Sequence, residues 1–313
     1  MATITQPVLE QTGVSFRRIL VATDFSPASE RALDFALAFA VRHHSRLYVV
    51  HALHAEPRQA VPLDPLPREL NRERIEAEQR MAALDVETRM QAVPHITVMR
   101  TGEVWDVLNC VIENEHIDLA VVGTHGRGTL KKLALGSVAE EVLRQAGCPV
   151  VTVGPHVVAA GQGDCCRSIL FPTDFGPASS RALPYALALA REWRAKLVLL
   201  HMVPPVAAMQ AGYVPAVFGT DEITQWQKTI REDAEKRLKQ LVPPGTLSPE
   251  AEYLVNAEFL PDGILFAAAQ HKVDFIVMGA NQSATPRIAA HLPWPVIHDV
   301  ICESRCPVLT VGG

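Results

Sequence analysis

The hydrophobic positions of the chain follow two alternating patterns. Short apolar, β-branched runs predict buried strands, and longer segments with apolar residues every three or four positions predict amphipathic helices. In the first half, strands are predicted at 19–23, 47–53, 96–100, 118–124 and 149–153, and helices from 26 onward, at 69–90, at 103–115 and at 137–146. Ser26 followed by Pro27 is typical of a helix start, because serine caps the first turn and proline fits its first position.

This alternation predicts an α/β fold, with a mostly parallel sheet covered by helices on both faces. In such sheets a ligand binds beyond the carboxyl ends of the strands, at the point where the strand order reverses. The segments that follow each predicted strand are therefore where binding residues are expected.

The second half of the chain repeats the first. Residues 17–51 align with residues 167–201 with 18 identities in 35 positions, where chance would give roughly two. IDLAVVG (117–123) returns as VDFIVMG (273–279), and CPVVTVG returns as CPVLTVG near the end. A period this long indicates duplicated domains rather than a solenoid. We predict an N-terminal extension at 1–16, a first domain at 17–154, a linker at 155–166 and a second domain at 167–313.

Composition narrows the class of protein. The 313 residues include 48% hydrophobic and 20% charged residues, and the net charge is −5. This describes a globular protein without the basic face that nucleic acids or anionic membranes require. No apolar run approaches the roughly 20 residues of a membrane helix, and the N-terminus does not resemble a signal peptide. Since the cysteines are also too sparse for a disulfide scaffold, we expect a cytoplasmic protein with no nucleic-acid or membrane partner.

The segment after the fourth predicted strand has a glycine spacing that suits a phosphate chain. Gly123, Gly126 and Gly136 are spaced G-x2-G-x9-G, and Ser137 follows at the start of a predicted helix. Glycine lets a ligand approach the backbone, and a helix N-terminus offers free N–H groups and a positive dipole end. An alternative explains the serine without a ligand, because Ser137-Val-Ala-Glu140 matches a capping box.

Two further polar residues end predicted strands, while other site motifs are absent. The sequence has no G-x4-G-K-[ST], no G-x-G-x2-G after a strand, no G-x-S-x-G and no H-E-x-x-H. Asp24 and Asp174 end the first strand of each repeat, and because Ser26 already caps the next helix, Asp24 is available to a ligand. His51 and His201 end the second strand in both repeats, where a binding role and a structural role are equally open.

These motifs resemble those of the universal stress protein family. The resemblance rests on ILVATDFS (19–26), on HAL (51–53), and on the spaced glycines with Ser137 and the later GCPVVTV (147–153). It covers the whole chain as a tandem pair of domains. It implies two Rossmann-like domains related to the adenine nucleotide alpha hydrolases, each a five-stranded parallel sheet of order 3-2-1-4-5 with helices on both faces.

The resemblance also implies an ATP site in the first domain. In ATP-binding members, adenine and ribose lie near the first-strand aspartate and near the residue after the second-strand histidine. The residues carried over for the base and the sugar are Ala22, Thr23, Asp24, Ala52, Val122 and Gly123, and those for the phosphates are Gly126, Gly136, Ser137 and Val138, with Arg127 from the same loop. The implied ligand is ATP, with Mg²⁺ as a candidate companion.

The second domain departs from the pattern in its phosphate loop. Gln282 replaces the second glycine, and Trp294-Pro295 stands where Gly136-Ser137 did. Gln282 adds a side chain where close approach is needed, and Pro295 removes a backbone donor. We predict one nucleotide per chain, while the second domain serves pairing or holds a different ligand. The resemblance implies that the last strands, 149–153 and 307–311, pair within the chain, and a homodimer stays open.

Three functions follow from these observations. The leading one is a cytoplasmic ATP-binding protein that regulates a stress response through nucleotide occupancy or partner contact. The second is slow ATP hydrolysis or autophosphorylation, which would need metal ligands and a group that positions the nucleophile. The loop offers His125, Arg127, Lys131 and Lys132 for such work. The third is a structural or interaction protein without a nucleotide.

Overall fold

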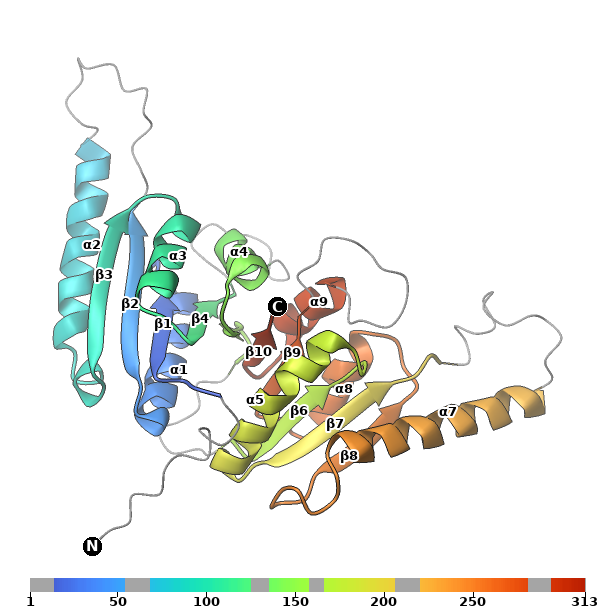
Figure 1. Cartoon of the computed structure of the whole chain (residues 1–313). Helices are drawn as coiled ribbons and strands as arrows, with labels where there is room; N and C mark the ends of the chain where they lie inside the picture. The colour runs from blue at the N-terminus through green and yellow to red at the C-terminus, as the bar shows by residue number, and fades with distance from the viewer. Residues whose placement is uncertain are drawn as a thin grey trace, which may run out of the picture. The chain divides into compact units, whose positions relative to one another are not determined.

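The two repeats form two compact units in the computed structural model, one at Phe16–Gln162 and the other beginning at Gly163 (Figure 1). The structure describes residues 14–53, 68–124, 135–157, 166–205, 220–280 and 294–312. Each unit alternates strands and helices, so the predicted α/β class is confirmed.

The first unit follows the predicted order of elements. Its strands are β1 (Arg18–Ala22), β2 (Arg46–Leu53), β3 (His95–Thr101), β4 (Leu119–Gly123) and β5 (Val150–Val153). Its helices are α1 (Pro27–His43), α2 (Arg68–Val86), the short 3-10 helix η2 (Met90–Ala92), α3 (Val104–Asn114) and α4 (Ser137–Gln145).

The second unit has the same order. Its strands are β6 (Ser168–Pro172), β7 (Lys196–Met202), β8 (Glu252–Asn256), β9 (Phe275–Gly279) and β10 (Val308–Val311). Its helices are α5 (Pro177–Trp193), α7 (Thr220–Leu241), α8 (Asp262–Gln270) and α9 (Trp294–Glu303).

Within each unit the strands are parallel. In the first unit they lie in the order β3-β2-β1-β4-β5, and in the second in the order β8-β7-β6-β9-β10. The chain builds outward from β1 through β2 to β3 and then returns to β4 on the other side of β1. Because the strands are parallel, the carboxyl ends of β1, β2 and β4 lie at one edge, and a doubly wound sheet holds its ligand where the order reverses along that edge.

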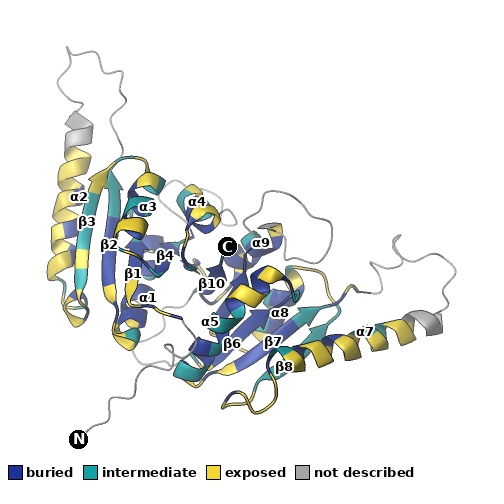
Figure 2. Cartoon of the chain, in the orientation of Figure 1, coloured by how far each residue is buried: buried dark blue, intermediate teal, exposed yellow. Residues whose placement is uncertain are grey.

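The most buried strands are β1, β4 and β5 in the first unit and β6, β9 and β10 in the second, whereas β3 and β8 have no buried residue (Figure 2). Ile19, Leu20 and Val21 of β1 are fully buried, as a strand covered on both faces requires. Helix α1 begins as the sequence predicts: Pro27 is its first residue, and the N–H of Ser29 donates to the Ser26 hydroxyl at 3.2 Å. The apolar side of α1 then packs on β1 and β4. This packing places the Thr23–Ser26 turn at the edge where the strand order reverses.

The cysteines that precede Pro-Val lie in the cores. Cys148 and Cys306 are each 8% exposed, and burial raises the pKa of the Cys148 thiol to about 12 and that of the Cys306 thiol to about 11. Buried thiols of high pKa stay protonated and are poor nucleophiles. Both therefore serve packing.

Candidate functional site

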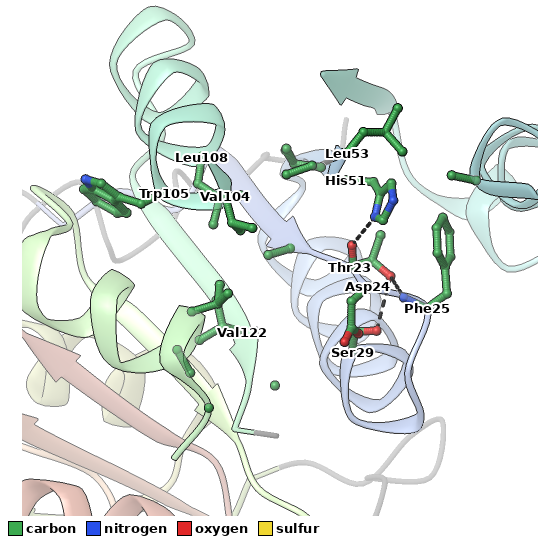
Figure 3. Close-up of a pocket in the computed structure, with 18 of the residues that line it drawn as sticks. Thr23, Asp24, Phe25, Ser29, His51, Leu53, Val104, Trp105, Leu108 and Val122 are labelled. Carbon is green, nitrogen blue, oxygen red and sulfur yellow. Dashed lines mark hydrogen bonds between the residues drawn. The ribbon is translucent and has the colours of Figure 1, made fainter. Parts of the chain in front are cut away.

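A cavity of about 940 Å³ opens in the first unit where the strand order reverses. It lies beyond the carboxyl ends of β1, β2 and β4, and helices α2, α3 and α4 supply its other walls. Figure 3 shows Thr23, Asp24, Phe25 and His51 grouped around the ends of β1 and β2, with Val104, Trp105 and Leu108 on α3 (Figure 3). Its size falls within the range of small-molecule sites.

The turn after β1 is held by its own polar groups. The N–H of Phe25 donates to the Thr23 hydroxyl at 3.0 Å, and the N–H of Ser26 donates to Oδ1 of Asp24 at 3.0 Å. The Ser29 hydroxyl lies 3.2 Å from the Thr23 hydroxyl. These contacts fix the Asp24 carboxylate at the cavity wall, where it presents acceptor oxygens.

Phe25 has a strained backbone that the surrounding contacts hold in place. Its φ is 58°, a left-handed conformation that is rare for a bulky residue. The ring centroid of Phe25 lies 4.6 Å from that of His51, and Nδ1 of His51 lies 2.7 Å from the carbonyl oxygen of Thr23. The guanidinium of Arg80 lies 5.5 Å from the Phe25 ring centroid, within the range of a cation–π contact. These contacts join β2 and α2 to the turn that carries Asp24.

The histidine near the end of the second strand has a structural contact in both units, which bears on the two roles left open by the sequence. In the second unit, Nδ1 of His201 lies 2.8 Å from the carbonyl oxygen of Thr173, and the His201 and Phe175 ring centroids are 4.5 Å apart. The repeated contact indicates that the histidine supports the turn. The His51 ring also lines the cavity of the first unit, so the structural role does not remove it from the site.

Gly123 is required by packing against α1. A Cβ built on Gly123 would lie 2.7 Å from the carbonyl oxygen of Ala28 and 3.1 Å from the N of Ser29. The counterpart Gly279 meets the backbone of Ala178 in the same way, at 2.3 Å from its carbonyl oxygen. The sequence suggested that the motif glycines leave room for a ligand. At Gly123 this explanation is wrong, because the space that a side chain would need is taken by the backbone of α1 and not by the cavity. The Gly123 residue nevertheless lines the cavity.

The N-terminus of α4 forms another wall of the cavity. Gly136 is the N-cap, with φ −65° and ψ 146°, and no side chain caps the helix. Because Ser137, Val138 and Ala139 begin the helix, their N–H groups have no partner within it. These three residues line the cavity, so its wall carries donors and the positive end of a helix dipole.

The capping-box alternative for Ser137 is wrong in this structure. Ser137 is the first helical residue rather than the cap, and Glu140 instead accepts from the Arg144 guanidinium at 2.9 and 3.0 Å. The N–H of Gly136 donates to the carbonyl oxygen of Thr124 at 2.7 Å, which holds the start of α4 beside the end of β4. Ser137 thus lines the cavity without capping the helix.

Most of the predicted site residues come together here. The cavity is lined by Ala22, Thr23, Asp24, Ala52, Val122, Gly123, Gly136, Ser137 and Val138, all of which the sequence singles out. Gly126 and Arg127 lie outside the residues that the structure describes.

The sequence analysis missed two walls of the cavity. One is α3, which contributes Val104, Trp105 and Leu108. The other is α2, whose contribution comes from one face of the helix, with residues Glu73, Glu76, Ala77 and Arg80. The rule that ligands bind beyond strand ends could have pointed to the start of α3, which follows β3. On α2, the i, i+3, i+4, i+7 spacing of the four residues could have shown that they share one face of the helix. Neither wall carries a motif.

The fold and the cavity define a doubly wound α/β protein with a ligand site at the strand-order reversal. The model of the universal stress protein family matches residues 15–154 and again residues 166–312. The chain therefore belongs to the universal stress protein family, as a tandem of two such domains.

Individual relatives and a solved structure support this assignment. Universal stress protein A homolog 1 of Coxiella burnetii is 34% identical over 139 residues, which is 44% of this chain and 96% of the relative. A universal stress protein of Mycolicibacterium smegmatis is 29% identical over 201 residues, which is 60% of this chain and 66% of the relative. A crystal structure of a universal stress protein from Archaeoglobus fulgidus covers 95% of this chain and 98% of its own, with a TM-score of 0.66 and 17% identity. That structure shows the shared tandem fold.

In the described parts of the present chain, no helix is both long and apolar enough to cross a membrane.

Proposed function

We propose that the first unit binds ATP in this cavity, and that the chain acts in the cytoplasm as a nucleotide-dependent regulator of a stress response. One observation carries the proposal: Asp24 and the uncapped N-terminus of α4 border the same cavity. A carboxylate accepts hydrogen bonds from ribose or adenine, and backbone N–H groups at a helix N-terminus donate to phosphate oxygens. The cavity therefore offers complementary groups to both parts of a nucleotide.

The apolar part of the cavity suits a base. Ala22, Ala52 and Val122 have small apolar side chains at the ends of three neighbouring strands, and Leu108 lines the cavity from α3. Small residues leave room for a flat ring, and apolar contact area stabilises it once it is buried. We assign adenine to this part of the cavity and the phosphates to Gly136, Ser137 and Val138, with Gly126 and Arg127 as further proposed phosphate ligands.

The charge of the cavity wall favours a nucleotide that carries a divalent cation. Among the residues that the structure describes, Arg80 is the one lysine or arginine that lines the cavity. The acidic residues that line it are Asp24, Glu73, Glu76, Glu103, Asp106 and Glu141. A triphosphate would be repelled by this wall unless Mg²⁺ or basic side chains offset its charge. ATP affinity should therefore fall when Mg²⁺ is removed with a chelator, while the affinity for uncharged adenosine should not change.

The first test is the nucleotide content of the freshly purified protein. The protein is denatured without added ligand and the released small molecules are identified by mass spectrometry. About one ATP or ADP per chain would support the proposal. A protein that contains no nucleotide and that also fails to bind added ATP in calorimetry would contradict the proposal. The function as a structural or interaction protein without a nucleotide would then be favoured.

A matched pair of variants locates the site. Asp24→Ala removes the carboxylate in the first unit, and Asp174→Ala removes its counterpart in the second. Loss of one hydrogen-bonded carboxylate is expected to weaken ATP binding by roughly tenfold or more for Asp24→Ala and to leave it unchanged for Asp174→Ala. Equal effects would contradict a site in the first unit alone.

Measuring ATP turnover in the same samples tests slow hydrolysis. Pairing through the last strands, or between two chains, remains a prediction that rests on the family resemblance.

A further inference from the structure

Arg80 lines the cavity from α2 and lies close to the turn after β1. It shares one face of the helix with Glu76 and Ala77, which also line the cavity. Ala77 is buried, whereas Arg80 is exposed. The guanidinium of Arg80 lies 5.5 Å from the ring centroid of Phe25. A group with several hydrogen-bond donors therefore lies beside the turn that carries the first-strand aspartate.

The guanidinium of Arg80 is not paired with a carboxylate of the described residues. Glu76 lies four residues before Arg80, a spacing that favours an ion pair on a helix. The Glu76 carboxylate instead accepts from Nε of Arg72 at 3.0 Å. Within the described ranges, no hydrogen bond or ion pair joins Arg80 to another residue. Because an arginine side chain has only donors and no acceptor, these donors are left for a ligand in the cavity.

The second unit has the same pair of residues in closer contact. AEQRM (77–81) on α2 returns as AEKRL (234–238) on α7, so Arg237 corresponds to Arg80. The guanidinium of Arg237 lies 4.0 Å from the Phe175 ring centroid. A cation–π contact extends to about 6 Å, so the contact of Arg80 with Phe25 lies near the outer limit of this range. Holding the ring accounts for the position of Arg237 better than for that of Arg80.

Arg80 lies at the end of the cavity opposite to the proposed phosphate site. Helix α2 packs on β3 and helix α4 packs on β5, and these strands stand at the two ends of the strand order of the first unit. The phosphates are assigned to the N-terminus of α4. The base is assigned to strand ends that include Ala52 on β2, the neighbour of β3. Arg80 is thus on the side of the base.

Arg80 supplies donors to the α2 wall, whose other residues are acceptors or apolar. Glu73 and Glu76 only accept hydrogen bonds when ionised, and Ala77 has no polar side chain. The ring nitrogens of adenine are acceptors. A guanidinium donates in one plane and stacks on flat rings. It therefore suits the acceptor edge of a base as well as its face.

We propose that Arg80 is a ligand-binding residue of the first unit, which donates hydrogen bonds to the ring nitrogens of the bound adenine. The inference rests on the proposed function and deepens it, because it names a side chain that recognises the base. Since Arg80 then contacts the nucleoside and not the phosphates, its contribution should be the same for adenosine and for ATP.

The test compares the binding of adenosine and of ATP with Mg²⁺ to the full chain by calorimetry. Arg80→Ala should weaken both by the same factor, roughly tenfold or more, because a charged donor is lost. Alanine is the best helix former, so the fold should persist, and circular dichroism checks it. Unchanged adenosine binding by Arg80→Ala, or a loss for ATP alone, would overturn the proposal.

Two controls accompany this variant. Arg74 lies on the same helix, pairs with Glu78 at 3.0 Å and does not line the cavity, so Arg74→Ala should change neither affinity. Arg237→Ala removes the corresponding arginine of the second unit and should also leave both affinities unchanged. A loss in either control as large as that in Arg80→Ala would overturn the proposal.

Arg80→Lys separates direct binding from support of the Phe25 ring. Lysine keeps the charge and a cation–π contact but lacks the planar set of donors. It should therefore bind adenosine at least about fivefold more weakly than the wild type. Wild-type affinity in Arg80→Lys would show that the residue only supports the ring, and would overturn the proposal.

Failure of the proposed function gives a different result from failure of this inference. If the wild type binds neither adenosine nor ATP, the proposed function is wrong and the inference falls with it. If the wild type binds both, and Arg80→Ala binds them equally well, only the inference is wrong.

Discussion

At the scale of single residues, the same side-chain type serves packing at one position and binding at another. Gly123 faces the backbone of α1 in the direction of its missing Cβ, whereas Gly136 caps α4 beside the cavity. The sequence places both in one spacing motif and does not distinguish them. The contact with Ala28 depends on how closely β4 and α1 approach, which is a property of the packed unit and not of the local sequence.

Gly123→Ala should destabilise the first unit. The new Cβ would lie 2.7 Å from the carbonyl oxygen of Ala28, and a backbone atom cannot rotate away, so we expect a loss of about 1–3 kcal/mol in the free energy of unfolding. Gly147→Ala is the control, because a Cβ on Gly147 meets nothing within 4 Å, and it should change stability by less than about 0.5 kcal/mol. Urea unfolding measures both. Equal stability of the two variants would show that α1 adjusts without cost.

His201 should make the second unit less stable in acid. Burial lowers the pKa of His201, and the charge of Arg237 lowers it further, against the hydrogen bond to Thr173 that raises it. Below the unfolded-state pKa of about 6.5, the unfolded chain binds the proton more readily than the folded one, so stability falls as the pH falls. The urea midpoint should therefore drop between pH 7.5 and 5.5 by more in the wild type than in His201→Gln. An identical drop would show that other groups carry the pH dependence.

At the scale of elements, the start of α4 matters more than its apolar face for the proposed site. The amides of Ser137, Val138 and Ala139 lack intrahelical partners and line the cavity. The amphipathic pattern predicts the helix, and the glycine spacing predicts its first turn as a phosphate site. The N-cap position was not predictable, because serine at 137 matches a cap as well as a first helical residue. The bond from Gly136 to the Thr124 carbonyl oxygen shifts the cap to the glycine.

Ser137→Pro should separate phosphate binding from folding. Proline is favoured at the first helical position, and Gly136 already has ψ of 146°, which the residue before a proline prefers. The substitution removes the Ser137 amide and hydroxyl without disturbing the helix. We expect ATP affinity to fall by roughly tenfold or more, with adenosine affinity and melting temperature unchanged. Calorimetry with both ligands checks this. A parallel loss of adenosine binding would show that the first turn positions the base instead.

At the scale of the whole molecule, the repeat in the sequence predicts most of the architecture. Hydrophobic periodicity predicts the alternation of strands and helices, and the internal repeat predicts the tandem of two domains. Both patterns remain recognisable after many substitutions. The cavity walls on α2 and α3 do not follow, because the residues on them carry no shared motif and meet only after the sheet is assembled. The close approach of Met202 to Gly263 was equally invisible, since it depends on contact between residues about sixty positions apart, on β7 and α8.

ATP should protect only the first unit from hydrogen exchange. A ligand slows local opening where it binds, so amides at 22–29, 50–53 and 135–141 should exchange more slowly with ATP present. The corresponding segment 173–179 and strand β7 should exchange at the same rate with and without ATP. Mass spectrometry of peptides from the full chain measures both sets together. Equal protection in the two units would contradict a single nucleotide site.

The close approach of Gly123 and Gly279 to their helices has a consequence for comparing members of this family. Both units keep this glycine, although only one is proposed to bind a nucleotide, so its presence reports shared ancestry of the fold. The glycines at 126 and 136 have no counterpart in the second unit, although that unit keeps the first glycine. A homologue should therefore be compared at these later positions before nucleotide binding is assigned to it from a sequence match.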